Sequence, residues 1–270
     1  MTDDANAVGP PPRRPGIWSG IGVVVLYLLL QLAVGLVFGI AIGLWQALKA
    51  GFEAGLQHRK PEIRAVVHAA MTNPDTRVVL AVVTIAVAAA IVIAIVHHTW
   101  PAQWARAELP GFGVVASRDW RAYLAAVVLG VVVVVLGGLM THLLAGKHPV
   151  HQDVSVLAGE VPLGMRLLLM LLAVGVAPIV EEVVFRGVLL SGLARRMPVA
   201  AAIIVSAIIF GCAHLPDFRF VWFPVPALIL VGLVLGWLRV RTHSLWPSIT
   251  MHATNNAMAV LAWFLVAHHP

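Results

Sequence analysis

Charged side chains are scarce in this chain of 270 residues. Eighteen basic and 12 acidic residues make up only 11% of the sequence, compared with about 25% in a typical soluble domain. Hydrophobic residues make up 60%, and the mean hydropathy is +0.93. So few charges cannot cover the surface of a water-soluble protein, so part of the apolar surface must face lipid. The composition predicts an integral membrane protein and excludes an intrinsically disordered chain.

Cysteine is also nearly absent. Cys212 is the only one, which excludes a scaffold held together by disulfides. The formal net charge is +6. Beside membrane spans, such a basic excess indicates contact with anionic lipids and control of topology. We therefore expect membrane lipids as partners and no nucleic acid.

Long apolar stretches dominate the rest of the sequence. Because they are continuous rather than alternating, they favour helices over a transmembrane barrel. The first is longer than the roughly 20 residues that a span needs, so it should tilt or protrude. The sequence predicts an all-α, polytopic bundle of about seven transmembrane helices after a disordered tail at 1–15. The stretches are 16–48, 78–105, 122–146, 165–190, 197–216, 220–238 and 242–270.

The fourth stretch carries the only acidic residues expected at membrane depth, Glu181 and Glu182. An ionised side chain near the bilayer centre costs roughly 2.5 to 3.5 kcal/mol, so such residues indicate a functional site. Glu182 and Arg186 are four residues apart and can pair on one helix face. Glu181 points about 100° away and needs a partner from another helix. Pro178 should kink the span and admit water.

Two histidines are the candidate partners of Glu181. His214 follows the predicted hairpin at 197–198 by as many residues as Glu181 precedes it, so the two should lie at similar depth. His252 is nearer its own preceding loop and reaches them only if helices tilt or extend. His252 and Asn256 share a helix face. A carboxylate and imidazoles around water can activate a nucleophile, and an imidazole with an amide can stabilise an oxyanion, which favours peptide-bond hydrolysis.

The order of these residues resembles a known family. The CPBP family of intramembrane proteases, which includes the type II CAAX prenyl endopeptidases and the bacterial Abi (bacteriocin self-immunity) proteins, has three similar motifs. The resemblance covers roughly 165–260. The motifs in this chain are Glu181-Glu182-Val-Val-Phe-Arg186, Phe210-x-x-x-His214 and His252-x-x-x-Asn256.

The resemblance implies a role for each motif residue. Glu181 and His214 would activate the attacking water, while His252 and Asn256 would stabilise the oxyanion. The supporting residues would be Glu182, Arg186 and Phe210. The family is commonly called a metalloprotease family, and a carboxylate with two neutral imidazoles is one zinc ligand set. Zn²⁺ bound by Glu181, His214 and His252 and a metal-free glutamate mechanism are therefore both compatible with the sequence, which has no H-E-x-x-H helix.

These observations divide the chain into the tail, three spans with their loops at 16–160 and a catalytic membrane domain at 161–270. We expect an endopeptidase of the cell membrane that acts on a membrane-associated protein or peptide. Basic residues at the span ends favour a cytoplasmic N-terminus. The alternatives are a small transporter coupled to protons or cations, and a catalytically idle immunity or scaffold protein of the same fold.

Overall fold

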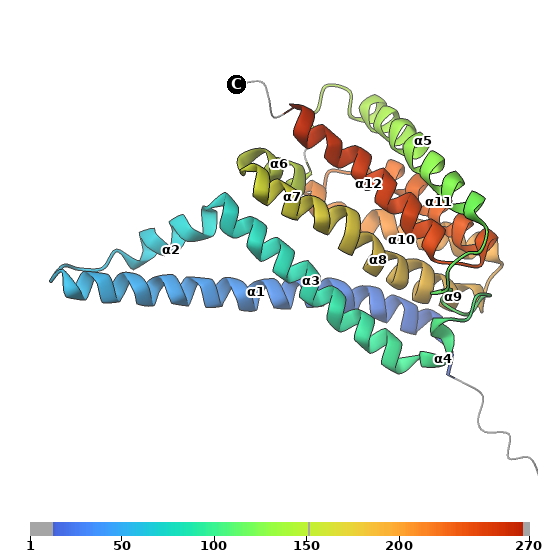
Figure 1. The fold of residues 1–270 in the computed structure, drawn as a ribbon, viewed down its shortest axis with the longest axis horizontal. Helices are drawn as coiled ribbons and strands as arrows, with labels where there is room; N and C mark the ends of the chain where they lie inside the picture. Colours follow the sequence, from blue (N-terminus) through green and yellow to red (C-terminus); the bar gives the residue numbers. More distant parts are fainter. Residues whose placement is uncertain (1–12, 151, 267–270) are drawn as a thin grey trace, which may run out of the picture.

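The computed structural model describes residues 13–150 and 152–266, and within these ranges it consists of helices and their connections without a β-strand. This confirms the all-α prediction (Figure 1). Most of the predicted tail at 1–15 lies outside the described residues. The N-terminal elements are α1 (Ile17–Leu56), α2 (Ile63–Thr72), α3 (Pro74–Thr99), α4 (Pro101–Trp104), α5 (Trp120–Ala145) and α6 (Asp153–Glu160).

The fourth predicted span is a single helical rod, Leu163–Ala194, in which α-helical and π-helical turns alternate. Pro178 has no N–H to donate, and the wider π-helical turns lie directly before and after the α-helical segment that contains it. π-helical turns of this kind are frequent at functional sites. The rod consists of α7 (Leu163–Leu171), η1 (Leu172–Val176), α8 (Ala177–Glu182), η2 (Val183–Leu189) and α9 (Leu190–Ala194).

Three further helices complete the bundle. They are α10 (Val199–Ala213), α11 (Val225–Thr242) and α12 (Trp246–Val266), with a short 3₁₀ turn, η3 (Leu215–Phe218), after α10. The rod α7–α9 runs between α1 and α3 on one side and α12 on the other (Figure 1). The fourth predicted span is therefore the central helix of the molecule.

Among the described residues, five helical segments are long and apolar enough to cross a membrane: α1, α3, α5, the rod α7–α9 and α11. They match five of the seven predicted spans. The fifth predicted span is α10, an apolar helix of only 15 residues. With 40 residues, α1 is about 60 Å long, twice the thickness of a typical hydrocarbon core. The length of α1 agrees with the expectation that it tilts or protrudes.

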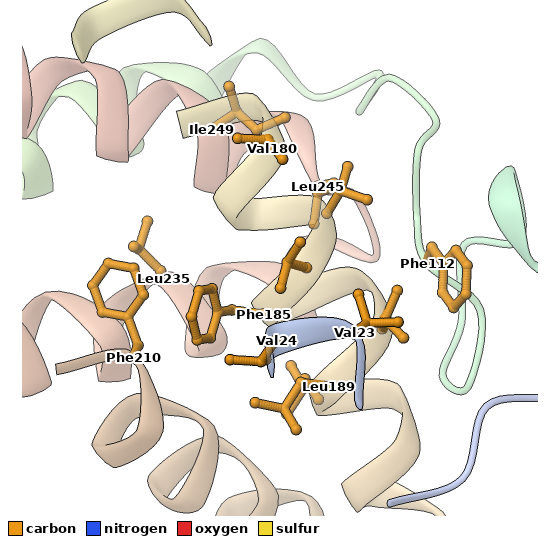
Figure 2. Close-up of a cluster of buried hydrophobic side chains, with 14 of the residues drawn as sticks. Val23, Val24, Phe112, Val180, Phe185, Leu189, Phe210, Leu235, Leu245 and Ile249 are labelled. Carbon is orange, nitrogen blue, oxygen red and sulfur yellow. The ribbon is translucent and has the colours of Figure 1, made fainter. Parts of the chain in front are cut away.

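The hydrophobic core joins α1 to the C-terminal helices. Figure 2 shows Val23 and Val24 of α1 beside Phe185 and Leu189 of η2. A side chain at Gly20 would lie 3.0 Å from the backbone of Leu189, so this glycine permits the close approach of α1. The first span is thus part of the same packed unit as the predicted catalytic helices.

The loop before α5 holds the turn between α11 and α12. Buried Arg239 donates to the carbonyls of Phe112 (3.1 Å) and Gly111 (2.7 Å). The amide of Leu245 donates to Gly113 (2.7 Å). These bonds fix the start of α12 inside the bundle. As a result, His252 in the second turn of α12 contacts Glu182, which lies 12 residues before the end of α9.

Candidate active site

Glu181 and the two predicted histidines meet in the structure. Oε2 of Glu181 lies 3.7 Å from Nε2 of His214 and 3.6 Å from Nε2 of His252. Glu181 and His214 lie at similar depth, as expected because the same number of residues separates each of them from the hairpin at 197–198. His252, which spacing alone leaves too near its loop, joins them because α12 begins inside the bundle. The three side chains are largely shielded, with 16%, 18% and 5% of their surfaces exposed.

Each imidazole is held through its other nitrogen. Nδ1 of His214 lies 2.8 Å from the carbonyl oxygen of Phe210, one turn earlier. Nδ1 of His252 lies 3.0 Å from Oε1 of Glu182. Since both partners accept hydrogen bonds, each ring carries a hydrogen on Nδ1 and turns Nε2 toward Glu181. The carboxylate therefore faces two imidazole nitrogens that are unprotonated in the neutral rings.

The predicted ion pair between Glu182 and Arg186 is confirmed. Nη1 of Arg186 donates to Oε1 of Glu182 over 3.0 Å, and both residues are fully buried. Nη2 of Arg186 donates to the carbonyl of Gly232 on α11 (3.3 Å), and the guanidinium carbon lies 4.3 Å from the ring centre of Phe210. The same oxygen of Glu182 binds His252. Glu182 thus contacts both Arg186 and His252, and Phe210 packs against Arg186.

Asn256 lies one turn after His252, and both side chains line a cavity of about 210 Å³. Nδ2 of Asn256 donates to the carbonyl of Ala173 in η1 (2.9 Å). In this π-helical turn each carbonyl is bonded five residues on, as Leu172 is to the amide of Ala177, and the corresponding partner of Ala173 is Pro178, which has no N–H. One of the two amide hydrogens of Asn256 is thus bound to the helix backbone, and the other has no hydrogen-bond partner among the described residues.

Two cavities meet at Glu181, His214 and Asp217. A cavity of about 210 Å³ extends toward α6 and α12, and one of about 470 Å³ extends toward α1 and α3. Asp217 was missed by the sequence analysis, which expected only Glu181 and Glu182 as acidic residues at membrane depth. The signal was its position in the turn directly after His214. Tyr27 and Gln31 of α1, which line the larger cavity, had no signal in the sequence.

Asp217 adds a second carboxyl group beside these cavities. Desolvation by the surrounding protein raises the pKa of the Asp217 carboxyl group. The charges of Glu181 and Asp153 act in the same direction, and the charge of a protonated His214 opposes them. This end of the site is held by an exposed ion pair, in which Nε of Arg219 donates to Oδ1 of Asp153 over 2.9 Å.

The donor set of Glu181, His214 and His252 has the chemistry of a zinc site, with one carboxylate and two inward imidazole nitrogens. Its geometry differs. Ligands about 2.0 to 2.1 Å from a tetrahedral zinc lie about 3.3 Å from one another, less than the 3.6 and 3.7 Å observed. Across 13–150 and 152–266, no three His, Cys, Asp or Glu side chains are arranged to hold one metal ion. Two of the three ligand-to-ligand distances are thus slightly longer in this arrangement than in an ideal tetrahedral zinc site.

Residues 163–258 match the family model described as type II CAAX prenyl endopeptidase Rce1-like. We call this matched segment the Rce1-like domain, after the family model that it resembles. It begins with α7 and contains every residue that the sequence analysis assigned to the site. The match supports, at the level of the family, a CAAX-type intramembrane protease. The division into 16–160 and 161–270 remains a prediction, and α1 to α6 lie outside the Rce1-like domain. Comparison with curated proteins and with solved structures gave no match.

Proposed function

We propose that this protein is an intramembrane endopeptidase that hydrolyses a peptide bond of a membrane-associated protein or peptide. One observation carries the proposal: the Glu181 carboxylate, on a membrane helix, faces two imidazole nitrogens at 3.6 and 3.7 Å where two cavities meet. A buried carboxylate with a purely structural role would be neutralised by a single ion-pair partner. Glu181 instead lies beside two imidazoles, which can accept and return protons.

In the proposed reaction, Glu181 accepts a proton from a water molecule, with His214 positioning that water through Nε2. The resulting hydroxide attacks the carbonyl carbon of the substrate. His252, in its protonated form, and the remaining amide hydrogen of Asn256 donate to the developing oxyanion. The proton held by Glu181 then passes to the leaving amine as the C–N bond breaks. Glu182 keeps the His252 ring oriented throughout, through its bond to Nδ1.

Zn²⁺ on Glu181, His214 and His252 is the alternative to this metal-free scheme. A bound zinc ion would supply a Lewis acid for the carbonyl and would make the water more acidic. The scheme above requires only the side chains of the chain itself. The two alternatives differ in metal content, which is measured directly.

The experiment compares membranes of cells that produce the wild type, Glu181→Gln or Glu53→Gln. Glu53 is an exposed glutamate of α1, paired with Lys49 at 4.0 Å, so its variant controls for the loss of one carboxylate. Quantitative proteomics of new peptide ends should reveal cleavage products in the wild type and in Glu53→Gln. Identical products in membranes with Glu181→Gln would overturn the proposal.

The same comparison separates the protease from a transporter. A proton- or cation-coupled transporter would change ion flux into vesicles without producing new peptide ends, and an idle scaffold would change neither. The Rce1-like domain favours the protease.

We further propose that the protein lies in the cell membrane with its N-terminus in the cytoplasm. Basic residues at several span ends support this orientation. Labelling of single cysteines, introduced into Cys212→Ala at Ser117 or at His58, would test it. Impermeant reagent that reaches Ser117→Cys in intact cells would contradict it, because this loop should lie on the cytoplasmic side.

A further inference from the structure

The larger cavity brings α1, which lies outside the Rce1-like domain, to the candidate site. The cavity has a volume of about 470 Å³. Tyr27 and Gln31 of α1 form one wall, while Glu181, His214 and Asp217 form the opposite side. A substrate that reaches Glu181 from this side therefore passes the polar ends of two α1 side chains.

Tyr27 is the better placed of the two. Only 4% of its surface is exposed, while Gln31 is half-buried. No hydrogen bond joins the Tyr27 hydroxyl to another residue in the described ranges. The hydroxyl oxygen is also not among the fully buried polar atoms that lack a partner there, so part of its surface is accessible. Glu181 and Asp217 line the same cavity as Tyr27. The hydroxyl thus remains open to the cavity that Glu181 also lines.

The backbone of α1 holds Tyr27 in place. Val23 and Val24, one turn earlier, are buried in the core, and Gly20 lies against Leu189. A hydroxyl on a fixed helix needs little reorganisation when charge develops beside it, which is the property of an effective oxyanion donor. The ring of tyrosine is rigid, and burial of this side chain restricts rotation about χ1 and χ2, so the hydroxyl has little freedom to move.

We propose that Tyr27 is a further catalytic residue, which donates a hydrogen bond from its hydroxyl to the carbonyl oxygen of the scissile peptide bond as that oxygen becomes negative. This rests on the proposed function. The proton stays on the phenol oxygen, and the bond shortens as the charge grows. His252 and Asn256 approach from α12, and Tyr27 approaches from α1. The first span is therefore part of the active site as well as an anchor.

The first test needs no substrate. The sequence contains only two tyrosines, and the hydroxyl of the other, Tyr123, accepts from the amide of Ser117 (3.1 Å) before α5. Tyrosine labelled with ¹³C at the ring carbon that bears the hydroxyl should give two NMR signals, assigned with Tyr27→Phe. Glu181→Gln should shift the Tyr27 signal and leave the Tyr123 signal in place. An unmoved Tyr27 signal would overturn the proposed contact.

The second test measures catalysis. The probe is a pool of quenched fluorescent peptides that carry an acyl chain, in vesicles of phosphatidylcholine and phosphatidylglycerol. Since loss of one oxyanion donor lowers kcat by about 10² to 10³, Tyr27→Phe should lose roughly that factor with little change in KM. Tyr123→Phe should match the wild type. A kcat for Tyr27→Phe within about twofold of the wild type would refute the role.

Failure of the proposed function is distinguishable from failure of this inference. Undiminished cleavage by Glu181→Gln, or an uncleaved pool with the wild type, contradicts the proposed function. Cleavage that depends on Glu181 but not on the Tyr27 hydroxyl contradicts only the role of Tyr27. A loss that appears equally in Tyr123→Phe, or only with a lower unfolding temperature, indicates a structural role and also refutes the proposal.

Discussion

Nδ1 of His252 lies 3.0 Å from Oε1 of Glu182, so the second acid of the pair orients an imidazole on another helix. The first acid, Glu181, faces Nε2 of the same ring. Two adjacent glutamates thus hold opposite sides of one histidine. This is possible because neighbouring residues on a helix point about 100° apart, and because His252 enters between them from α12.

Arg186→Ala should destabilise the protein strongly. The change leaves the Glu182 carboxylate buried and without its ion-pair partner, and breaking a buried pair in this way costs about 3 to 5 kcal/mol. The matched control is Arg219→Ala, which breaks the exposed pair with Asp153 and should cost at most about 1 kcal/mol. Thermal unfolding in detergent measures both. Equal unfolding temperatures for the two variants would contradict the buried role of Arg186.

His214→Ala should remove activity without unfolding the protein. Its ring is partly exposed to the cavities and its Nδ1 bonds only to the carbonyl of Phe210 in the described structure, so little packing is lost. Loss of a group that positions the water should lower kcat by about 10² to 10⁴. Peptide cleavage in vesicles and the unfolding temperature are measured together. His148→Ala, in the loop after α5, serves as a control that should retain activity.

Metal content should separate the two schemes for Glu181. If the metal-free scheme holds, active purified protein contains no stoichiometric zinc by elemental analysis, and chelators leave cleavage unchanged. One zinc per chain in the wild type, lost in both Glu181→Gln and His214→Ala, would instead support the metalloprotease alternative. Measuring the variants distinguishes site-bound zinc from zinc held elsewhere by surface histidines.

Gly113→Ala should loosen the loop that positions α12. Gly113 has a φ of +71°, and an added Cβ would lie 2.5 Å from Cζ of Arg239. Gly146→Ala is the matched control, since it has a φ of +57° but no atom within 4 Å of the added Cβ. Both variants carry the backbone strain of about 1 to 3 kcal/mol, and only Gly113→Ala adds a clash. A similar unfolding temperature for both would show that the clash is relieved at no cost.

The sequence by itself determined the membrane setting, the helical class and the local pairing of Glu182 with Arg186. Each follows from composition, from the length of apolar stretches or from the helical repeat, which act within one segment. The similar depth of Glu181 and His214 also followed, because a short hairpin fixes the register of two consecutive helices.

Only the tertiary structure decided which side chains from distant segments reach Glu181. His252 comes within 3.6 Å because the loop before α5 holds the start of α12 inside the bundle, through carbonyls that no sequence motif marks. Tyr27 lines the cavity because Gly20 lets α1 approach Leu189 closely. Such contacts depend on how separate helices pack against one another, and spacing along one helix carries no information about them.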